Sequence, residues 1–258
     1  MINQTDLNGR VLFDQGNHTF IWLGSDPNYR RGVVQTNQYL IIDNGKGYLL
    51  DPGGIHLFAR VVSSVSRYIS IDKIAGIFFS HQDPDVSSGI ALWLGVTEAK
   101  IYVSNLWLRF LPHFGIVDSS RVLGIEDGNK SLSLPSGSKF SFIPAHFLHS
   151  TGQFNLYDEK AKMLFTGDIG AAVFPEGEEE VFVEDFDKHI KYIEGFHKRY
   201  MASNAAARKW LSVVSRLPID MMLPQHGAIY TGDNVKRFFS WFENLKCGID
   251  IIDSIYSA

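Results

Sequence analysis

Three side chains able to bind a metal ion alternate along one short loop. His81, Asp83 and Asp85 occupy every second position, and in an extended stretch alternate side chains point to the same side. Pro84 is expected to favour that extended form. Imidazole and carboxylate groups are common nitrogen and oxygen ligands of transition metals. The loop is therefore predicted to aim all three side chains at one metal centre.

Three further side chains of the same two types follow apolar segments later in the chain: His149, Asp168 and His226. Gly167 and Gly170 flank Asp168 and permit close backbone approach there. The single cysteine, Cys247, can form neither an internal disulfide nor a cysteine-based zinc site. A centre built from three imidazoles and three carboxylates is a hard, oxygen-rich set, which favours iron or manganese over zinc.

The elements around these residues must bring them together. Apolar and β-branched runs predict strands, and apolar residues at helical spacing predict helices. Strands are expected at 18–23, 36–43, 46–51, 74–80, 100–103, 140–143, 153–158, 162–165 and 221–223, and helices at 55–69, 90–96, 104–113, 187–199, 204–216 and 233–245. Asn44-Gly45 predicts a tight turn, Ser104 a helix cap, and 174–180 a surface loop. Strands followed by helices, twice over, indicate two sheets packed face to face with helices outside.

Length and composition exclude several classes of protein. A chain of 258 residues fits one large domain spanning 1–258. The net charge of −4 and the lack of a basic run argue against a nucleic-acid partner. Apolar runs such as 74–79 are too short to cross a membrane, and the first residues lack the features of a signal peptide. With one cysteine, the chain is expected to be cytoplasmic.

The order and spacing of the six residues resemble the metallo-β-lactamase superfamily, whose two-metal site uses a His-x-His-x-Asp-His loop followed by His, Asp and His. The sequence departs from that pattern because Asp83 replaces the second histidine and Val86 the fourth ligand. A carboxylate at the place of Asp83 is similar to the flavodi-iron proteins, as are Tyr200 and the segment Pro224-Gln-His-Gly227. The loop from His81 to Val86 most resembles the stand-alone oxygen-binding di-iron proteins that lack a flavodoxin domain.

The resemblance implies an α+β (or α/β) fold, a four-layer αββα sandwich of the metallo-β-lactamase type. It places His81, Asp83 and His149 on a first metal, Asp85 and His226 on a second, and Asp168 between both. The metals would be two iron ions, with zinc or manganese as alternatives. Val86 would leave the second metal one ligand short unless water or His146 fills the position. Such an open position, with apolar Val86 beside it, suits a diatomic molecule.

The expected function is a non-haem di-iron protein that binds dioxygen or nitric oxide, as an oxygen reductase or an oxygen sensor. Reduction of dioxygen to water takes four electrons and two iron ions supply two, so turnover needs an electron donor. With no FMN site expected in this chain, a separate electron-donor protein or a signalling partner is implied. The alternatives are a zinc hydrolase using a bridging hydroxide and a metal-poor scaffold that binds a partner. Whether the chain is an enzyme stays open.

Other polar residues are given lesser roles. Gln82 is expected to be a spacer that points away from the metals, with donation to a bound ligand as the alternative. His146 is expected to be an ordinary loop histidine, or else to support or gate the metal site. No part in the chemistry is expected of the remaining histidines, which are His18, His56, His113, His189 and His197. The oligomeric state is left open, with a homodimer as one possibility because the similar flavodi-iron proteins are often dimers.

Overall fold

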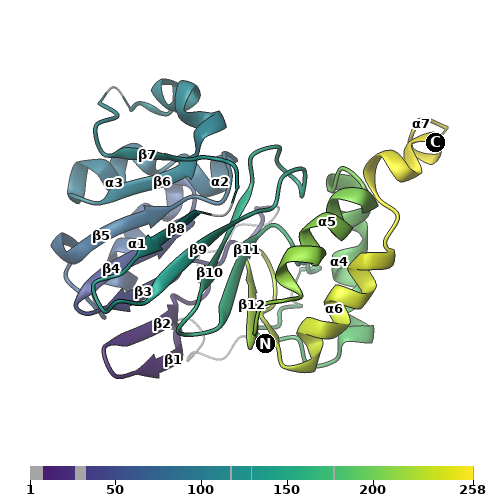
Figure 1. The fold of residues 1–258 in the computed structure, drawn as a ribbon, viewed down its shortest axis with the longest axis horizontal. Coiled ribbons are helices and arrows are strands. Elements are labelled where there is room, and N and C mark those ends of the chain that lie inside the picture. Colours follow the sequence, from purple (N-terminus) through teal and green to yellow (C-terminus); the bar gives the residue numbers. More distant parts are fainter. Residues whose placement is uncertain (1–7, 27–32, 117, 129, 177, 258) are drawn as a thin grey trace.

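Two mixed β-sheets lie face to face in the computed structural model, which describes residues 8–26, 33–116, 118–128, 130–176 and 178–257 (Figure 1). The first sheet has the order β1-β2-β3-β4-β5-β6-β7, antiparallel up to β4 and parallel from β4 to β7. Its strands are β1 (Arg10–Gln15), β2 (His18–Trp22), β3 (Tyr39–Asp43), β4 (Lys46–Leu50), β5 (Ile74–Phe78), β6 (Lys100–Ser104) and β7 (Val122–Ile125).

The second sheet has the order β13-β12-β11-β10-β9-β8, and only its pair β11 and β12 is parallel. Its strands are β8 (Lys130–Ser133), β9 (Lys139–Pro144), β10 (Phe154–Asp158), β11 (Met163–Gly167), β12 (Met221–Pro224) and β13 (Tyr230–Thr231). Strands β5, β11 and β12 each run directly into a polar loop. These three loops carry most of the predicted metal ligands.

Helices cover the outer face of each sheet, which confirms the four-layer αββα arrangement (Figure 1). α1 (Phe58–Val65) and α3 (Ile90–Val96) pack on the first sheet, and α4 (Phe186–Tyr200), α5 (Asn204–Val214) and α6 (Asp233–Asn244) pack on the second. Shorter helical segments are α2 (Pro84–Ser87), α7 (Ile252–Tyr256), η2 (Ile55–Leu57), η3 (Ile71–Lys73), η4 (Asn105–Phe114) and η5 (Gly248–Ile251). In the described part of the chain, no helix is both long and apolar enough to cross a membrane.

Alternating side chains of the central strands divide the core into layers. Phe20 and Trp22 of β2 lie between the sheets and pack with second-sheet residues such as Phe165. Ile21 points the other way and packs with Val61 of α1. This alternation follows from the two-residue period of a strand. Because β2 has apolar residues on both faces, both of its faces are buried.

Two turn and cap signals are confirmed by the backbone. Asn44 and Gly45 have φ angles of 47° and 77°, so both central residues of the β3–β4 hairpin adopt the left-handed conformation that an Asn-Gly turn favours. The side chain of Ser104 accepts a hydrogen bond from the backbone N–H of Leu106 at the start of η4. Both features fix where an element ends.

Some predicted boundaries were wrong. The expected helix 55–69 is a 3₁₀ turn followed by the shorter α1, and the expected helix 104–113 is the 3₁₀ helix η4, which contains Pro112. Strands β1, β7, β8 and β13 and helix α7 were not predicted. Strand β8 shows why, because three of its four residues are exposed and it carries no alternating apolar pattern.

Candidate metal centre

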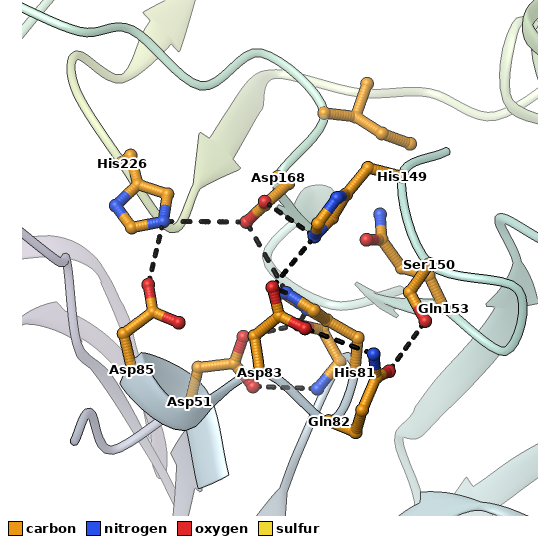
Figure 2. A network of polar contacts seen from close by, with 12 residues as sticks. Asp51, His81, Gln82, Asp83, Asp85, His149, Ser150, Gln153, Asp168 and His226 are labelled. Atoms are coloured by element: carbon orange, nitrogen blue, oxygen red, sulfur yellow. Dashed lines mark hydrogen bonds and ion pairs between the residues drawn. The ribbon is translucent and has the colours of Figure 1, made fainter. Parts of the chain in front are cut away.

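All six predicted side chains meet at one end of the sandwich (Figure 2). The strand β5 ends just before His81, and the loop between β9 and β10 carries His149. Asp168 follows β11 directly, and His226 follows β12 after one intervening residue. The carboxyl ends of these strands, from both sheets, lie at the same end of the sandwich, so four segments far apart in the sequence supply side chains to one place.

Asp168 lies at the middle of the group and is only 4% exposed. Its Oδ1 lies 3.8 Å from Nε2 of His81 and 3.6 Å from Nε2 of His226, while its Oδ2 lies 3.3 Å from Nε2 of His149. The carboxylate therefore faces imidazoles from both halves of the site. This position is the one expected of a ligand shared by two metals.

The remaining residues fall into two groups on either side of Asp168. In the first group, Oδ2 of Asp83 lies 3.1 Å from Nε2 of His149 and 3.7 Å from Nε2 of His81. In the second group, Oδ2 of Asp85 lies 3.2 Å from Nε2 of His226. The structure thus places Asp83 beside His81 and His149, and Asp85 beside His226.

The donor set fits metal ions better than it fits a hydrogen-bond network. Oδ1 of Asp168 is buried and has no hydrogen-bond partner among the described residues. Ligands bound at about 2.1 Å from one ion lie roughly 3 to 4 Å apart, and potential ligand atoms of His81, His149 and Asp168 all lie within 4.8 Å of one another. Cations there would compensate the buried carboxylate charge.

The loop after His81 does not stay extended, so that part of the prediction was wrong. Asp83 is extended, with φ −62° and ψ 150°, but Pro84 begins the short helix α2 and Asp85 lies in its first turn. Proline is favoured at this position because its fixed φ suits a helix start. The helical turn sends Asp83 to the first group and Asp85 to the second, whereas an extended loop would aim both at one centre.

The structure shows other contacts for Val86 and His146, the two residues that were considered for the open position on the second metal. Val86 is fully buried and packs in the core outside the first sheet. His146 has its Nε2 3.0 Å from Oδ1 of Asp127, and its ring meets the ring of Phe154 edge-on. The structure therefore engages His146 with Asp127 and gives Val86 a packing role.

A buried carboxylate that the sequence analysis missed holds His81 in place. Oδ1 of Asp51 accepts the backbone N–H of Ser80 at 2.7 Å, and its Oδ2 accepts the Ser80 hydroxyl at 2.5 Å. The hydroxyl oxygen lies 2.9 Å from Nδ1 of His81. Burial raises the pKa of Asp51 to about 8. Once ionised, Asp51 takes the hydroxyl proton, so Nδ1 of His81 donates to Ser80 and the Nε2 lone pair faces the space between Asp83 and Asp168, where a cation would lie. The Asp51-Pro-Gly-Gly turn after β4 was visible in the sequence, but nothing local linked it to His81.

We expect Asp51→Ala to weaken metal binding about 10- to 100-fold, the usual cost of losing a residue that orients a metal ligand. Without the carboxylate, the Ser80 hydroxyl can donate to His81 and the imidazole is no longer held in one tautomer. Competition titration with a chromophoric chelator measures the change. Asp72→Ala removes an exposed carboxylate and serves as the matched control. Equal affinity in the two variants would contradict this role.

The electrostatics of the metal-free site favour protonated histidines. Burial alone would lower the pKa of His226, but the hydrogen bond that His226 donates to Asp85 and the charges of Asp168 and Asp85 outweigh it and raise the pKa to about 9. Burial also lowers the pKa of His149, but Asp83 and Asp168 outweigh it, so the pKa is raised above its ordinary value. His81 differs, since burial dominates and lowers its pKa. His226 is therefore protonated at neutral pH when no metal is bound, and the pKa of His149 is shifted in the same direction.

Metal affinity should therefore rise with pH while the stability of the metal-free protein falls. A metal must displace the proton of His226, so affinity is expected to increase about tenfold per pH unit between pH 7 and 9 for that one proton. Protonated His226 stabilises the metal-free fold fully at pH values below its unfolded-state pKa of 6.5. This contribution is lost as the pH rises through the folded-state pKa of about 9. Melting temperatures of metal-free and metal-loaded protein from pH 6 to 10 should diverge. Parallel curves would contradict the assignment.

Aromatic rings cover one side of the first group. The centroid of the Tyr200 ring lies 5.8 Å from that of His149. It lies 4.7 Å from the centroid of Phe196, on which the Tyr200 ring stacks. Tyr200 is 55% exposed, so it lies at the surface of the site. The two rings shield the outer face of the His149 imidazole from water.

A family model described as ODP family beta lactamase matches residues 34–227. A solved structure described as a peroxy diiron species of the chemotaxis sensor ODP is 58% identical, with a TM-score of 0.87, and the match covers 96% of this chain and 99% of that one. The apo state of the chemotaxis sensor ODP from T. denticola is 59% identical, with the same TM-score, and the match covers 96% and 98% of the two chains.

More distant matches share the fold. Rubredoxin oxygen:oxidoreductase from Desulfovibrio gigas is 16% identical with a TM-score of 0.78, and the match covers 91% of this chain and 60% of that one. An uncharacterized protein of Methanocaldococcus jannaschii is 24% identical over 241 residues, covering 86% of this chain. The chain spans 57% of the length of that curated relative.

Proposed function

The chain belongs to the ODP family of the β-lactamase fold, and on that basis we propose that it is a non-haem di-iron protein that binds dioxygen and senses it. The observation that carries the proposal is the buried carboxylate of Asp168, whose two oxygens face imidazoles from both groups. The 58% identical chain whose described state is a peroxy diiron species supports iron and oxygen as metal and ligand.

In this proposal each side chain has a defined place. His81, Asp83 and His149 would hold the first iron, Asp85 and His226 would hold the second, and Asp168 would be the ligand shared by both. Two ferrous ions there would supply dioxygen binding and up to two electrons. The carboxylates neutralise much of the metal charge. The site therefore attracts anions only weakly, and a neutral diatomic molecule can bind without having to displace one.

The remaining residues orient these ligands and limit water. The Gln35 carbonyl accepts the Nδ1 proton of His226 at 2.8 Å, which leaves Nε2 free to face the second metal. Ser80 does the same for His81. Such partners fix the tautomer and raise the basicity of a ligating imidazole. Phe196 and Tyr200 shield His149.

A sensor fits better than a reductase or a hydrolase. The relatives of 58% and 59% identity are described as chemotaxis sensors, so we propose a signalling partner for this chain rather than an electron donor. A zinc hydrolase would use a histidine-richer centre, whereas Asp83 makes this one more acidic and harder. Nitric oxide, another neutral diatomic, is expected to compete with dioxygen for the same site.

Anaerobic iron loading tests the proposal. The metal-free protein is expected to take up two ferrous ions per chain and, on exposure to oxygen, to develop a charge-transfer absorption without continued oxygen consumption. Continued consumption with an added electron donor would indicate a reductase. Preferential binding of zinc with no spectral response to oxygen would overturn the di-iron proposal, and fewer than about one metal ion per chain would favour a partner-binding scaffold.

A further inference from the structure

Gln82 links two predicted metal ligands that come from different sheets (Figure 2). Its side-chain Nε2 donates to Oδ1 of Asp83 at 3.1 Å, and its Oε1 accepts the hydroxyl proton of Ser150 at 2.7 Å. Ser150 directly follows His149, whose Nε2 lies 3.1 Å from Oδ2 of Asp83. The contacts close a ring through Asp83, Gln82, Ser150 and His149. Gln82 thus lies outside the group of metal ligands, as expected of a residue that points away, but its side chain is hydrogen-bonded at both ends.

The surroundings of Ser150 fix the orientation of the amide. The hydroxyl oxygen of Ser150 accepts a hydrogen bond from the backbone N–H of Gly152 at 3.4 Å. The single hydroxyl proton of Ser150 is donated to Gln82. Rotating the amide by half a turn would place its carbonyl oxygen against the Asp83 carboxylate, where two acceptors would repel each other. Ser150 is only 5% exposed, so water competes weakly for this hydrogen bond.

The two oxygens of Asp83 therefore have different tasks. Oδ2 faces the imidazoles of His149 and His81, at 3.1 and 3.7 Å. Oδ1 is held on the outside by the amide of Gln82. A hydrogen-bonded oxygen is turned away from the metal and its electron density is partly withdrawn, so it is a poorer ligand.

We propose that Gln82, anchored by Ser150, is a positioning residue that keeps Asp83 bound to the first metal through Oδ2 alone. This inference rests on the proposed function, because it assumes that Asp83 is a ligand. Its consequence is that the first metal keeps one coordination position that a chelating carboxylate would fill. A residue between two ligands in the sequence thus controls how many positions are open to a small molecule.

Gln82→Met tests the proposal, because methionine has a similar length and no N–H donor. Metal-free protein is titrated with Co²⁺, whose visible absorption reports the coordination number and whose affinity is measured by chelator competition. We expect weaker absorption, because Oδ1 joins the coordination and raises the coordination number. We also expect an affinity about 10-fold lower or more, because Asp83 is no longer held in position before the metal binds. Ser150→Ala should change both in the same direction by less. Gln15→Met, at an exposed position of β1, is the matched control and should behave as the unmodified protein.

The double variant separates this role from a general packing effect. If Ser150 acts only by anchoring Gln82, then Gln82→Met with Ser150→Ala should match Gln82→Met alone, because residues acting through one chain of contacts are not additive. A fully additive loss would overturn the anchoring. An unchanged spectrum with affinity within about twofold in Gln82→Met would overturn the positioning role, whereas failure of the unmodified protein to bind two ions would overturn the proposed function instead.

Discussion

Asp168→Ala is expected to abolish binding of both metal ions while leaving the fold intact. The two oxygens of Asp168 face both groups of imidazoles, at 3.3 to 3.8 Å. Losing a residue that merely supports a ligand costs about 10- to 100-fold in affinity, so losing the shared ligand itself should cost more for each metal. Elemental analysis after anaerobic iron loading measures the loss.

The folded state should survive this change, because the imidazoles around Asp168 keep other carboxylate partners. Nε2 of His226 lies 3.2 Å from Oδ2 of Asp85, and Nε2 of His149 lies 3.1 Å from Oδ2 of Asp83. Asp168→Asn keeps the shape and loses the charge, and we expect it to lose at least one of the two ions. His56→Ala, at an exposed position, should leave the metal content unchanged. Two retained ions in Asp168→Ala would refute the bridging assignment.

The strand-end positions of the site were accessible from the sequence for a simple reason. Apolar runs that end in polar, ligand-type residues mark where buried strands reach the surface, and His81, Asp168 and His226 all follow such runs. The fold then brings the carboxyl ends of β5, in the first sheet, and of β11 and β12, in the second, to the same end of the sandwich. Residue type and spacing therefore predicted which side chains meet, although they did not predict how each is oriented.

The supporting residues could not be found in the same way. Asp51 lies 29 positions before Ser80, and Ser150 lies 68 positions after Gln82. No sequence pattern connects such pairs, because each contact depends on the register between strands and on the packing of one sheet against the other. The course of the loop after Asp83 was also missed, since Pro84 is compatible both with an extended segment and with the first position of a helix.

A second expected effect lies at the opposite end of the sandwich, where a histidine assigned no part in the chemistry joins the two sheets. The ring of His18 on β2 has Nδ1 2.8 Å from Oδ2 of Asp43 on β3 and Nε2 2.7 Å from Oδ2 of Asp158 on β10. All three side chains are fully buried. Burial lowers the pKa of His18, but the two carboxylates outweigh it and raise the pKa above the ordinary value.

We expect His18→Leu to reduce the free energy of unfolding by about 3 to 5 kcal/mol, because it leaves two carboxylates buried without their cation. The raised pKa of His18 makes its contribution complete below about pH 6.5 and removes it as pH rises through the folded-state pKa. The lowered pKa of Asp43 makes its contribution complete above about pH 4 and removes it in stronger acid. The difference between the two proteins should therefore be largest in the mildly acidic range.

Denaturant unfolding of metal-free protein across that pH range measures the effect without interference from the metal centre. Adding Asp43→Asn and Asp158→Asn to His18→Leu removes the stranded charges, and the triple variant should recover part of the lost stability, as uncharged replacements of buried ion pairs often do. If His18→Leu alone lowered the free energy of unfolding by less than about 1 kcal/mol, the imidazole would contribute only by filling space in the core. A loss that the triple variant does not reverse would locate the effect in shape rather than in charge.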